Sequence, residues 1–186
     1  MRDPVKILVL LGSVRRGRMS DRVATFVMAR LAAIPEVDAE LADLRAIDLP
    51  VMEERLGRIE PPPAGLVKLG AAIKGADAVV VVSPEYNHGC PGALKNALDY
   101  FLPEFARTPA ALVTVSGGGH GGVNAWAQLV PVLVYMGAFV LPQTVAVSKV
   151  QDAFDEHGNA VDQAYVKRID GMLTELAWLA GRVRGA

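Results

Sequence analysis

Short, strongly apolar runs alternate along this chain with longer segments of helical period, and this alternation limits the fold more than any other feature. The runs cover residues 5–11, 78–82, 110–115 and 139–147, and a loop or turn signal follows each. Parallel strands have this composition because helices cover both faces of their sheet. The alternation therefore predicts βαβ units around a parallel sheet.

A fifth strand, expected at residues 37–44, has a different pattern. Apolar and acidic side chains alternate there, as in an edge strand with one face in water. Helices are expected near residues 20–34, 64–75, 91–102, 121–137 and 160–181. Right-handed crossovers leave few topologies for five such strands, and the flavodoxin-like order 2-1-3-4-5 is the commonest. We predict a three-layer α/β/α fold, with ligands beyond the carboxyl ends of the first, third and fourth strands.

Length and charge bound the class of protein. A chain of 186 residues fits one domain, 1–186, and such a chain buries roughly 70% of its unfolded surface. With 19 Lys and Arg against 20 Asp and Glu, it has no electrostatic footprint for nucleic acid or anionic membrane. The single cysteine, Cys90, cannot form an intramolecular disulfide, and the apolar stretch 7–11 is too short for a signal peptide or membrane span. We expect a cytoplasmic protein with small-molecule partners.

Residues 48–65 have weak periodicity and contain four prolines. This segment is expected to form a long surface loop after the second strand. Loops of this length in a compact domain act as lids or contact segments, or are disordered connections, and both alternatives stay open.

The loop after the first strand, residues 12–20, has the composition of an anion pocket. It combines two glycines, two serines and three arginines just before a helix amino terminus, where N–H groups and the helix dipole favour negative charge. A Walker loop is excluded because Gly-Lys-Ser/Thr is missing. Asp43 could mimic a ribose-binding acid, but a dinucleotide fingerprint needs a third glycine. A terminal monophosphate fits better; the alternative is a solvated turn in which Ser20 is only an N-cap.

The turn after the third strand, Pro-Glu-Tyr-Asn at 84–87, offers the groups that a flat, polar-edged ring needs. Tyr86 can stack on or edge a ring, Asn87 presents a donor and an acceptor, and the backbone around Glu85 can read ring carbonyls. A phosphate at the first loop and a ring at this one describe a single mononucleotide.

The loop after the fourth strand, residues 116–122, matches G-x-G-x-x-G through Gly117, Gly119 and Gly122. The match is weak, because the acidic residue wanted about 20 positions further on would fall at Pro142, inside an apolar strand. The loop does offer backbone without side chains, so a ring can approach closely. The alternative is an ordinary strand-to-helix turn. His88, Cys90 and His120 on these loops lack a metal-ligand spacing, and we predict no metal site.

Three segments together, residues 12–18, 84–100 and 116–122, resemble the NADPH-dependent FMN reductase family, and the resemblance spans roughly residues 5–147. The resemblance implies noncovalent FMN, NADPH or NADH as co-substrate, and electron transfer to flavins, quinones, azo dyes or metal oxyanions. It also implies a homodimer or homotetramer with the flavin near an interface. Departures from the family pattern are Leu129-Val130, where many relatives carry Leu-Arg, and Cys90, where a bulkier apolar or aromatic residue is usual.

The resemblance also assigns roles to individual residues. Phosphate contacts are expected from Ser13, Arg15, Arg18, Met19 and Ser20. Contacts to the isoalloxazine ring are expected from Pro84, Glu85, Tyr86 and Asn87, with Ser116, Gly117 and Gly119 flanking the ring. No catalytic residue is expected, because the flavin carries the hydride chemistry, and backbone N–H groups of 116–119 are candidate donors to the pyrimidine edge.

Two other functions compete with an FMN-dependent NAD(P)H oxidoreductase. One is a flavodoxin-like electron carrier or flavin-binding scaffold without direct NAD(P)H turnover, although the chain lacks the acidic excess typical of flavodoxins. The other is a binding module that uses the same fold and holds no flavin. Bound FMN and its reduction by NADPH would separate the three.

Overall fold

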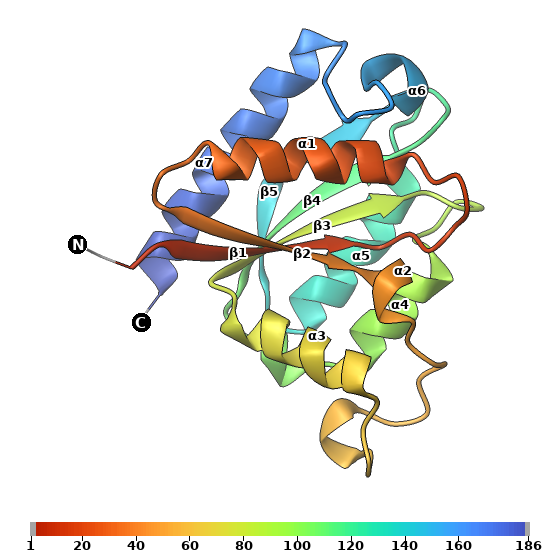
Figure 1. Cartoon of the computed structure of the whole chain (residues 1–186), viewed down its shortest axis with the longest axis vertical. Coiled ribbons are helices and arrows are strands. Elements are labelled where there is room, and N and C mark those ends of the chain that lie inside the picture. The colour runs from red at the N-terminus through yellow and green to blue at the C-terminus, as the bar shows by residue number, and fades with distance from the viewer. Residues whose placement is uncertain (1–2, 185–186) are drawn as a thin grey trace.

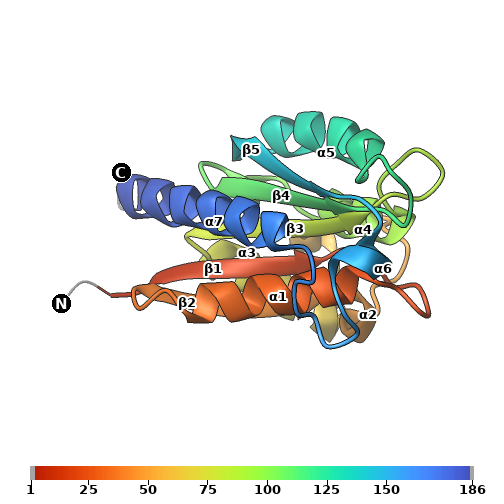
Figure 2. The same cartoon turned by 90° about the horizontal axis from the view of Figure 1, so that it is seen from above.

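The computed structural model describes residues 3–184, which form one parallel five-stranded sheet of order β2-β1-β3-β4-β5 between two layers of helices (Figures 1 and 2). The predicted flavodoxin-like topology is confirmed. In chain order the strands are β1 (Val5–Leu11), β2 (Val37–Asp43), β3 (Ala78–Pro84), β4 (Pro109–Val115) and β5 (Phe139–Val147).

The helices alternate with these strands, as the crossover rule requires. In chain order they are α1 (Ser20–Ala32), α2 (Leu44–Ile47), α3 (Ala64–Gly75), α4 (Gly92–Asp99), α5 (Val123–Tyr135), α6 (Val150–Ala153) and α7 (Gln163–Val183), with 3₁₀ turns η1 (Leu56–Arg58) and η2 (Pro103–Phe105). No helix within residues 3–184 is long and apolar enough to cross a membrane.

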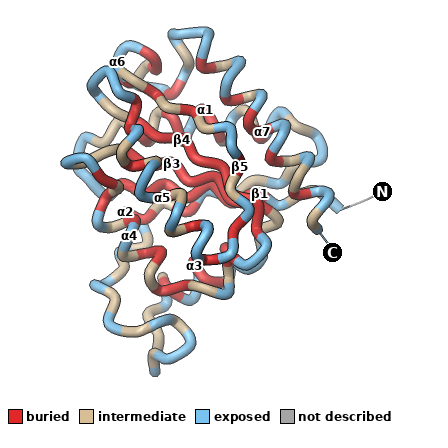
Figure 3. The backbone as a smooth tube through the Cα atoms, turned by 180° about the vertical axis from the view of Figure 1, so that it is seen from behind, coloured by how far each residue is buried: buried red, intermediate tan, exposed pale blue. Residues whose placement is uncertain are grey.

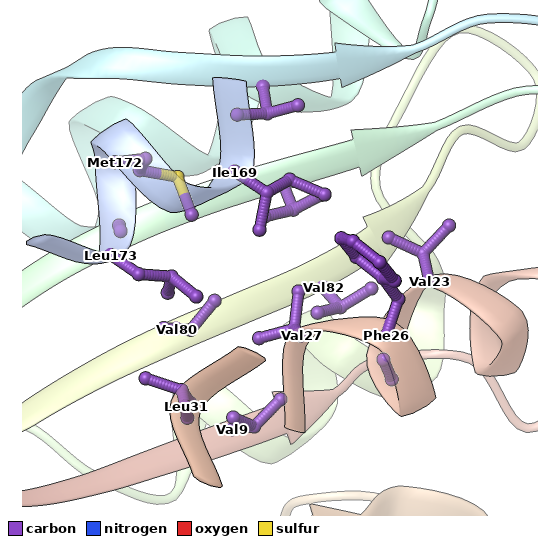
Figure 4. Close-up of a cluster of buried hydrophobic side chains, with 14 of the residues drawn as sticks. Val9, Val23, Phe26, Val27, Leu31, Val80, Val82, Ile169, Met172 and Leu173 are labelled. Atoms are coloured by element: carbon purple, nitrogen blue, oxygen red, sulfur yellow. The ribbon is translucent and has the colours of Figure 1, made fainter. Parts of the chain in front are cut away.

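Two apolar cores lie on opposite faces of the sheet. Helices α1 and α7 cover one face, where Val23, Val27 and Leu31 of α1 follow the four-residue spacing of a helix stripe (Figure 4). Helices α3, α4 and α5 cover the other face (Figure 1). The central strands are buried throughout, as their unbroken apolar runs predict (Figure 3).

Element ends differ from the predictions where side chains cap a helix or glycine bends the backbone. Strand β2 stops at Asp43, because its carboxylate accepts a hydrogen bond from the Arg45 N–H and starts the unpredicted helix α2. Helix α5 starts two residues later than predicted, because Gly121 and Gly122 have φ of 63° and 81°. Such φ values lie outside the helical region.

The segment 48–65 is packed against helix α4. The Asn96 side chain donates to the Pro50 carbonyl and accepts from the Met52 N–H, at 2.7 and 2.8 Å. The Leu56 N–H donates to the Tyr100 carbonyl at 3.1 Å. These bonds favour a contact segment over a disordered connection.

Candidate functional site

Three loops meet at the carboxyl edge of the sheet, because β1, β3 and β4 are neighbours in it. The hydroxyl groups of Ser13 and Tyr86 are 2.7 Å apart, which joins the first loop to the second. The side chain of Met19 reaches the third loop, since its Cε lies 3.9 Å from where a Cβ on Gly117 would stand. The residues predicted from three separate segments therefore lie in one place.

The first loop ends in a helix terminus without a side-chain cap. Met19 is the N-cap residue of α1, and its side chain makes no capping hydrogen bond. Ser20 is the first helical residue and only 2% exposed, and its Oγ finds no hydrogen-bond partner among residues 3–184. The alternative that Ser20 is merely an N-cap is therefore wrong. A buried hydroxyl without a partner costs about 1–3 kcal/mol, so this position favours a ligand.

The arginines of this loop face different ways. Arg15 is exposed, and its guanidinium carbon lies 5.7 Å from the centre of the Tyr86 ring. Arg16 is also exposed. Arg18 instead turns inward, where its guanidinium donates to both carboxylate oxygens of Asp43 and to the Ser13 carbonyl. The ion pair with Asp43 raises the Arg18 pKa despite partial burial. Asp43 is therefore engaged within the protein and is not presented as a ribose-binding acid.

The second loop is a tight turn. Tyr86 and Gly89 exchange two backbone hydrogen bonds of 2.9 and 3.1 Å, and the two residues between them, Asn87 and His88, have φ of 50° and 62°. Positive φ at both central residues is the pattern of a type I′ turn. The turn leaves Asn87 and His88 exposed, while Pro84 is buried at the end of β3.

The Glu85 carboxylate caps helix α5 instead of facing outward. It accepts hydrogen bonds from the N–H and side-chain amide of Asn124, at 2.8 and 3.0 Å. Burial acts to raise the Glu85 pKa, but these bonds outweigh burial and hold it below its ordinary value. Gln128, one turn along α5, accepts from the Cys90 N–H and donates to the His88 carbonyl. Sequence reasoning missed Asn124 and Gln128, whose i, i+4 spacing was the available signal.

The third loop has two kinds of glycine. Gly121 and Gly122 are required by the fold, since a Cβ would come within 2.8 Å of Ala146 and 2.9 Å of Thr114. Gly118 and Gly119 have ordinary φ, and a Cβ there would meet nothing within 4 Å. Backbone geometry therefore does not require glycine at 118 or 119, and their lack of side chains leaves open space beside the loop.

Hydrogen bonding in the third loop leaves several donors unused. Ser116 is committed within the protein, because its N–H donates to the Val147 carbonyl and its Oγ bonds the Gly118 carbonyl and the Gly121 N–H. The N–H groups of residues 117–120 donate to no acceptor in the described part of the chain. This loop therefore presents backbone donors from its glycines rather than from Ser116.

Residues 3–184 contain no group of three His, Cys, Asp or Glu side chains arranged to hold a metal ion. Cys90 is partly buried, and burial raises the pKa of its thiol. A raised pKa lowers the thiolate population, which makes this cysteine a poor nucleophile.

A family model described as NADPH-dependent FMN reductase matches residues 5–152, which carry all three loops. The chain belongs to the NADPH-dependent FMN reductase family. It is accordingly an oxidoreductase that uses FMN and NAD(P)H. FMN is a mononucleotide, so the family's cofactor agrees with the ligand predicted from the three loops.

Relatives of this chain match it over its whole length. A quinone reductase of Escherichia coli K12 is 33% identical over 99% of this chain and 100% of its own. An NAD(P)H-dependent FMN reductase of Pseudomonas aeruginosa is 32% identical over the full length of both chains. Among solved structures, the flavoenzyme FerB of Paracoccus denitrificans has a TM-score of 0.79 at 24% identity, and covers 96% of this chain and 98% of its own. The last similarity supports the fold.

The residues of the three loops fit FMN. A phosphate at the amino terminus of α1 would give the buried Ser20 hydroxyl the partner that it lacks and would meet the helix dipole. The exposed Arg15 belongs to the same loop, and no carboxylate within residues 3–184 forms an ion pair with it. The unused N–H groups of 117–120 suit the polar edge of a ring.

Proposed function

We propose that this enzyme passes electrons from NAD(P)H through FMN to a quinone or a similar small acceptor. The relatives named quinone reductase, FMN reductase and NADPH azoreductase support an acceptor of this class. The buried, unpartnered hydroxyl of Ser20 at an uncapped helix terminus is the observation that carries the cofactor's placement.

In this proposal the phosphate lies at loop 12–20, where the Ser20 hydroxyl, the Arg15 guanidinium and the backbone at Ser13 and Met19 surround it. The Ser13 hydroxyl, by contrast, lies 2.7 Å from the Tyr86 hydroxyl and so holds the Tyr86 ring in position. A helix terminus and one unpaired arginine together provide the donors and the positive charge that a phosphate dianion needs.

The isoalloxazine ring then lies between the second and third loops. Tyr86 and Asn87 contact it from one loop, and Gly117 and Gly119 from the other. Pro84, Glu85 and Ser116 support these contacts from behind, because Pro84 is buried, the Glu85 carboxylate caps α5 and the Ser116 hydroxyl is bonded within its loop. FMN supplies the redox chemistry when bound, so the protein needs no acid or base of its own.

The absorption spectrum of freshly purified protein tests this function, followed by anaerobic addition of NADPH and then of a quinone. We expect a yellow protein that NADPH bleaches and the quinone restores. Bound FMN that NADPH does not bleach would instead identify an electron carrier. Colourless protein that takes up no added FMN would exclude the proposal, and Arg15→Ala is expected to retain less FMN than the wild type.

We further propose that the whole chain acts as one FMN-binding domain in the cytoplasm and assembles as a homodimer or homotetramer. The absence of a second cysteine for an intrachain disulfide agrees with a reducing compartment. Exposed apolar side chains at the end of α5 and the start of β5 support assembly: Val134, Tyr135 and Phe139. Contiguous exposed apolar groups are typical of protein contact surfaces.

A further inference from the structure

The Arg18–Asp43 ion pair lies at the base of the phosphate loop. Its side chains are only 9% and 25% exposed. Arg18 Nη1 donates to Asp43 Oδ1 at 2.7 Å, and Arg18 Nη2 donates to Asp43 Oδ2. Such a two-bond fork fixes orientation as well as distance.

The charge of Arg18 is largely compensated within the protein, and its two terminal nitrogens are hydrogen-bonded there. Nη1 also donates to the Ser13 carbonyl, whereas the buried Nε makes no hydrogen bond within residues 3–184 and lies 3.8 Å from a carboxylate oxygen of Asp21. Two carboxylates therefore surround this guanidinium. A cation so compensated offers little net attraction to a phosphate, which the same carboxylates repel.

Asp43 is itself held from two sides. Its carboxylate accepts from the Arg45 N–H and caps helix α2. It also lies opposite Leu11, the last residue of β1, in the β1–β2 register. The ion pair consequently connects the start of the loop, through the Ser13 carbonyl, and its end, through Arg18, to the edge strand β2.

We propose that Arg18 and Asp43 are positioning residues of the cofactor site, which hold loop 12–20 in its phosphate-binding conformation without Arg18 binding the phosphate. The inference rests on the proposed FMN site. Strand β2 and helix α2 carry no predicted site residue, but in this proposal they contribute to cofactor affinity through Asp43.

Asp43→Asn tests this assignment, because the two alternatives predict changes of FMN affinity in different directions. Asparagine preserves the size of the side chain and can still cap α2. A positioning role predicts FMN binding about tenfold weaker, because the fork that orders the loop is broken. A direct Arg18–phosphate contact predicts binding that is unchanged or tighter, because a competing carboxylate has been neutralised. The measurement is fluorescence titration of apoprotein with FMN, and unchanged or tighter binding overturns the inference.

Riboflavin, which lacks the phosphate, separates positioning from general damage. We expect Asp43→Asn to change riboflavin affinity by less than about twofold, so the preference for FMN falls. Equal weakening of both flavins would overturn the inference. The matched control is Asp38→Asn, which removes the same charge from an exposed position on β2 and should leave both affinities unchanged.

Arg18→Lys provides a second test. Lysine keeps the charge but cannot form the two-bond fork, so a positioning role predicts a loss of FMN affinity similar to that of Asp43→Asn. The double variant should bind FMN no more weakly than the weaker-binding of the two single variants. FMN binding by Arg18→Lys at wild-type strength would overturn the inference. If the wild-type apoprotein bound no FMN, the proposed function itself would fail, which is a distinguishable result.

Discussion

The side chains of loop 12–20 differ in the direction that they face and in the partners that they already have. Arg15 and Arg18 are three positions apart in one loop, yet Arg15 is exposed and Arg18 is bonded to Asp43. Ser20 is buried without a partner, although a serine before a helix is commonly a cap. At this scale, whether a side chain is free to bind a ligand depends on the hydrogen bonds and ion pairs that it already makes within the protein.

Ser20→Ala should weaken FMN binding while leaving the apoprotein as stable as before or slightly more so. The hydroxyl is expected to donate to phosphate, and a hydrogen bond to a charged group contributes about 1.5–3 kcal/mol, or roughly tenfold to hundredfold in affinity. In the apoprotein its loss removes a buried group that lacks a partner. Flavin titration and thermal unfolding of apoprotein measure the two effects.

Thr174→Ala, at an exposed position on α7, is the control for this substitution and should change neither quantity. A fall in apoprotein stability with unchanged FMN affinity would mean that Ser20 supports the fold and does not contact the cofactor.

At the scale of elements, helix α5 couples the two loops that are proposed to hold the ring. Its first turn is capped by Glu85 from the second loop, and it follows the glycines of the third. Gln128 adds a second connection to the Tyr86–Gly89 turn, because its side-chain amide donates to the His88 carbonyl. The position of α5 therefore determines the separation of these loops.

Glu85→Gln should destabilise the protein by about 0.5–2 kcal/mol at neutral pH, because the charged cap of α5 is lost. The Glu85 pKa is lower in the folded protein than in the unfolded chain, so its contribution is present above the unfolded pKa of about 4.3. That contribution disappears as pH falls through the folded pKa. Urea unfolding at a series of pH values should show the two proteins converging at acid pH, whereas a pH-independent difference would contradict the charged cap.

Gly122→Ala and Gly119→Ala should have opposite consequences. Alanine at 122 requires φ of 81° and would place Cβ 2.9 Å from Thr114, so we expect a loss of about 1–3 kcal/mol in unfolding free energy. Alanine at 119 meets nothing within 4 Å and should leave apoprotein stability unchanged while lowering FMN affinity. Apoprotein unfolding and flavin titration test both, and undiminished FMN binding by Gly119→Ala would place the ring elsewhere.

At the scale of the whole molecule, the parallel sheet brings together Ser13 and Tyr86, which are 73 positions apart in the chain, while the start of β1 and the end of α7 lie at the opposite end of the strands (Figure 1). The exposed apolar end of α5, where Tyr135 is 78% exposed, precedes the start of β5 and so lies away from the site. A contact there would differ from the interface near the flavin that the family resemblance implies.

Tyr135→Glu should shift the protein toward a smaller oligomer without changing flavin affinity. A charge placed within a protein contact surface is costly unless it is paired, whereas the same charge on a monomer surface is solvated. Sedimentation velocity measures the assembly state, and the control is Lys68→Glu at an exposed position on α3. An unchanged sedimentation coefficient would place the contact surface elsewhere or show that the chain is a monomer.

Much of the fold could be predicted from local pattern. The runs 5–11 and 139–147 match β1 and β5 at both ends, and the segment 64–75 matches α3. The short elements α2, α6, η1 and η2 were not predicted, because each spans only three or four residues and shows no period. Motif composition likewise indicated a mononucleotide site and its family.

The tertiary structure decided what each polar side chain in that site does. Apolar period and turn residues determine strands, helices and their order, because those signals are local. The partner of a carboxylate or guanidinium depends on which strand ends are neighbours, and this arises only when the sheet assembles. Asp43 meets Arg18 because β2 lies beside β1, and Glu85 meets Asn124 because the loops after β3 and β4 share one edge. The sequence alone thus determined which segments form the site, and the fold decided which of their polar side chains are already bonded within the protein.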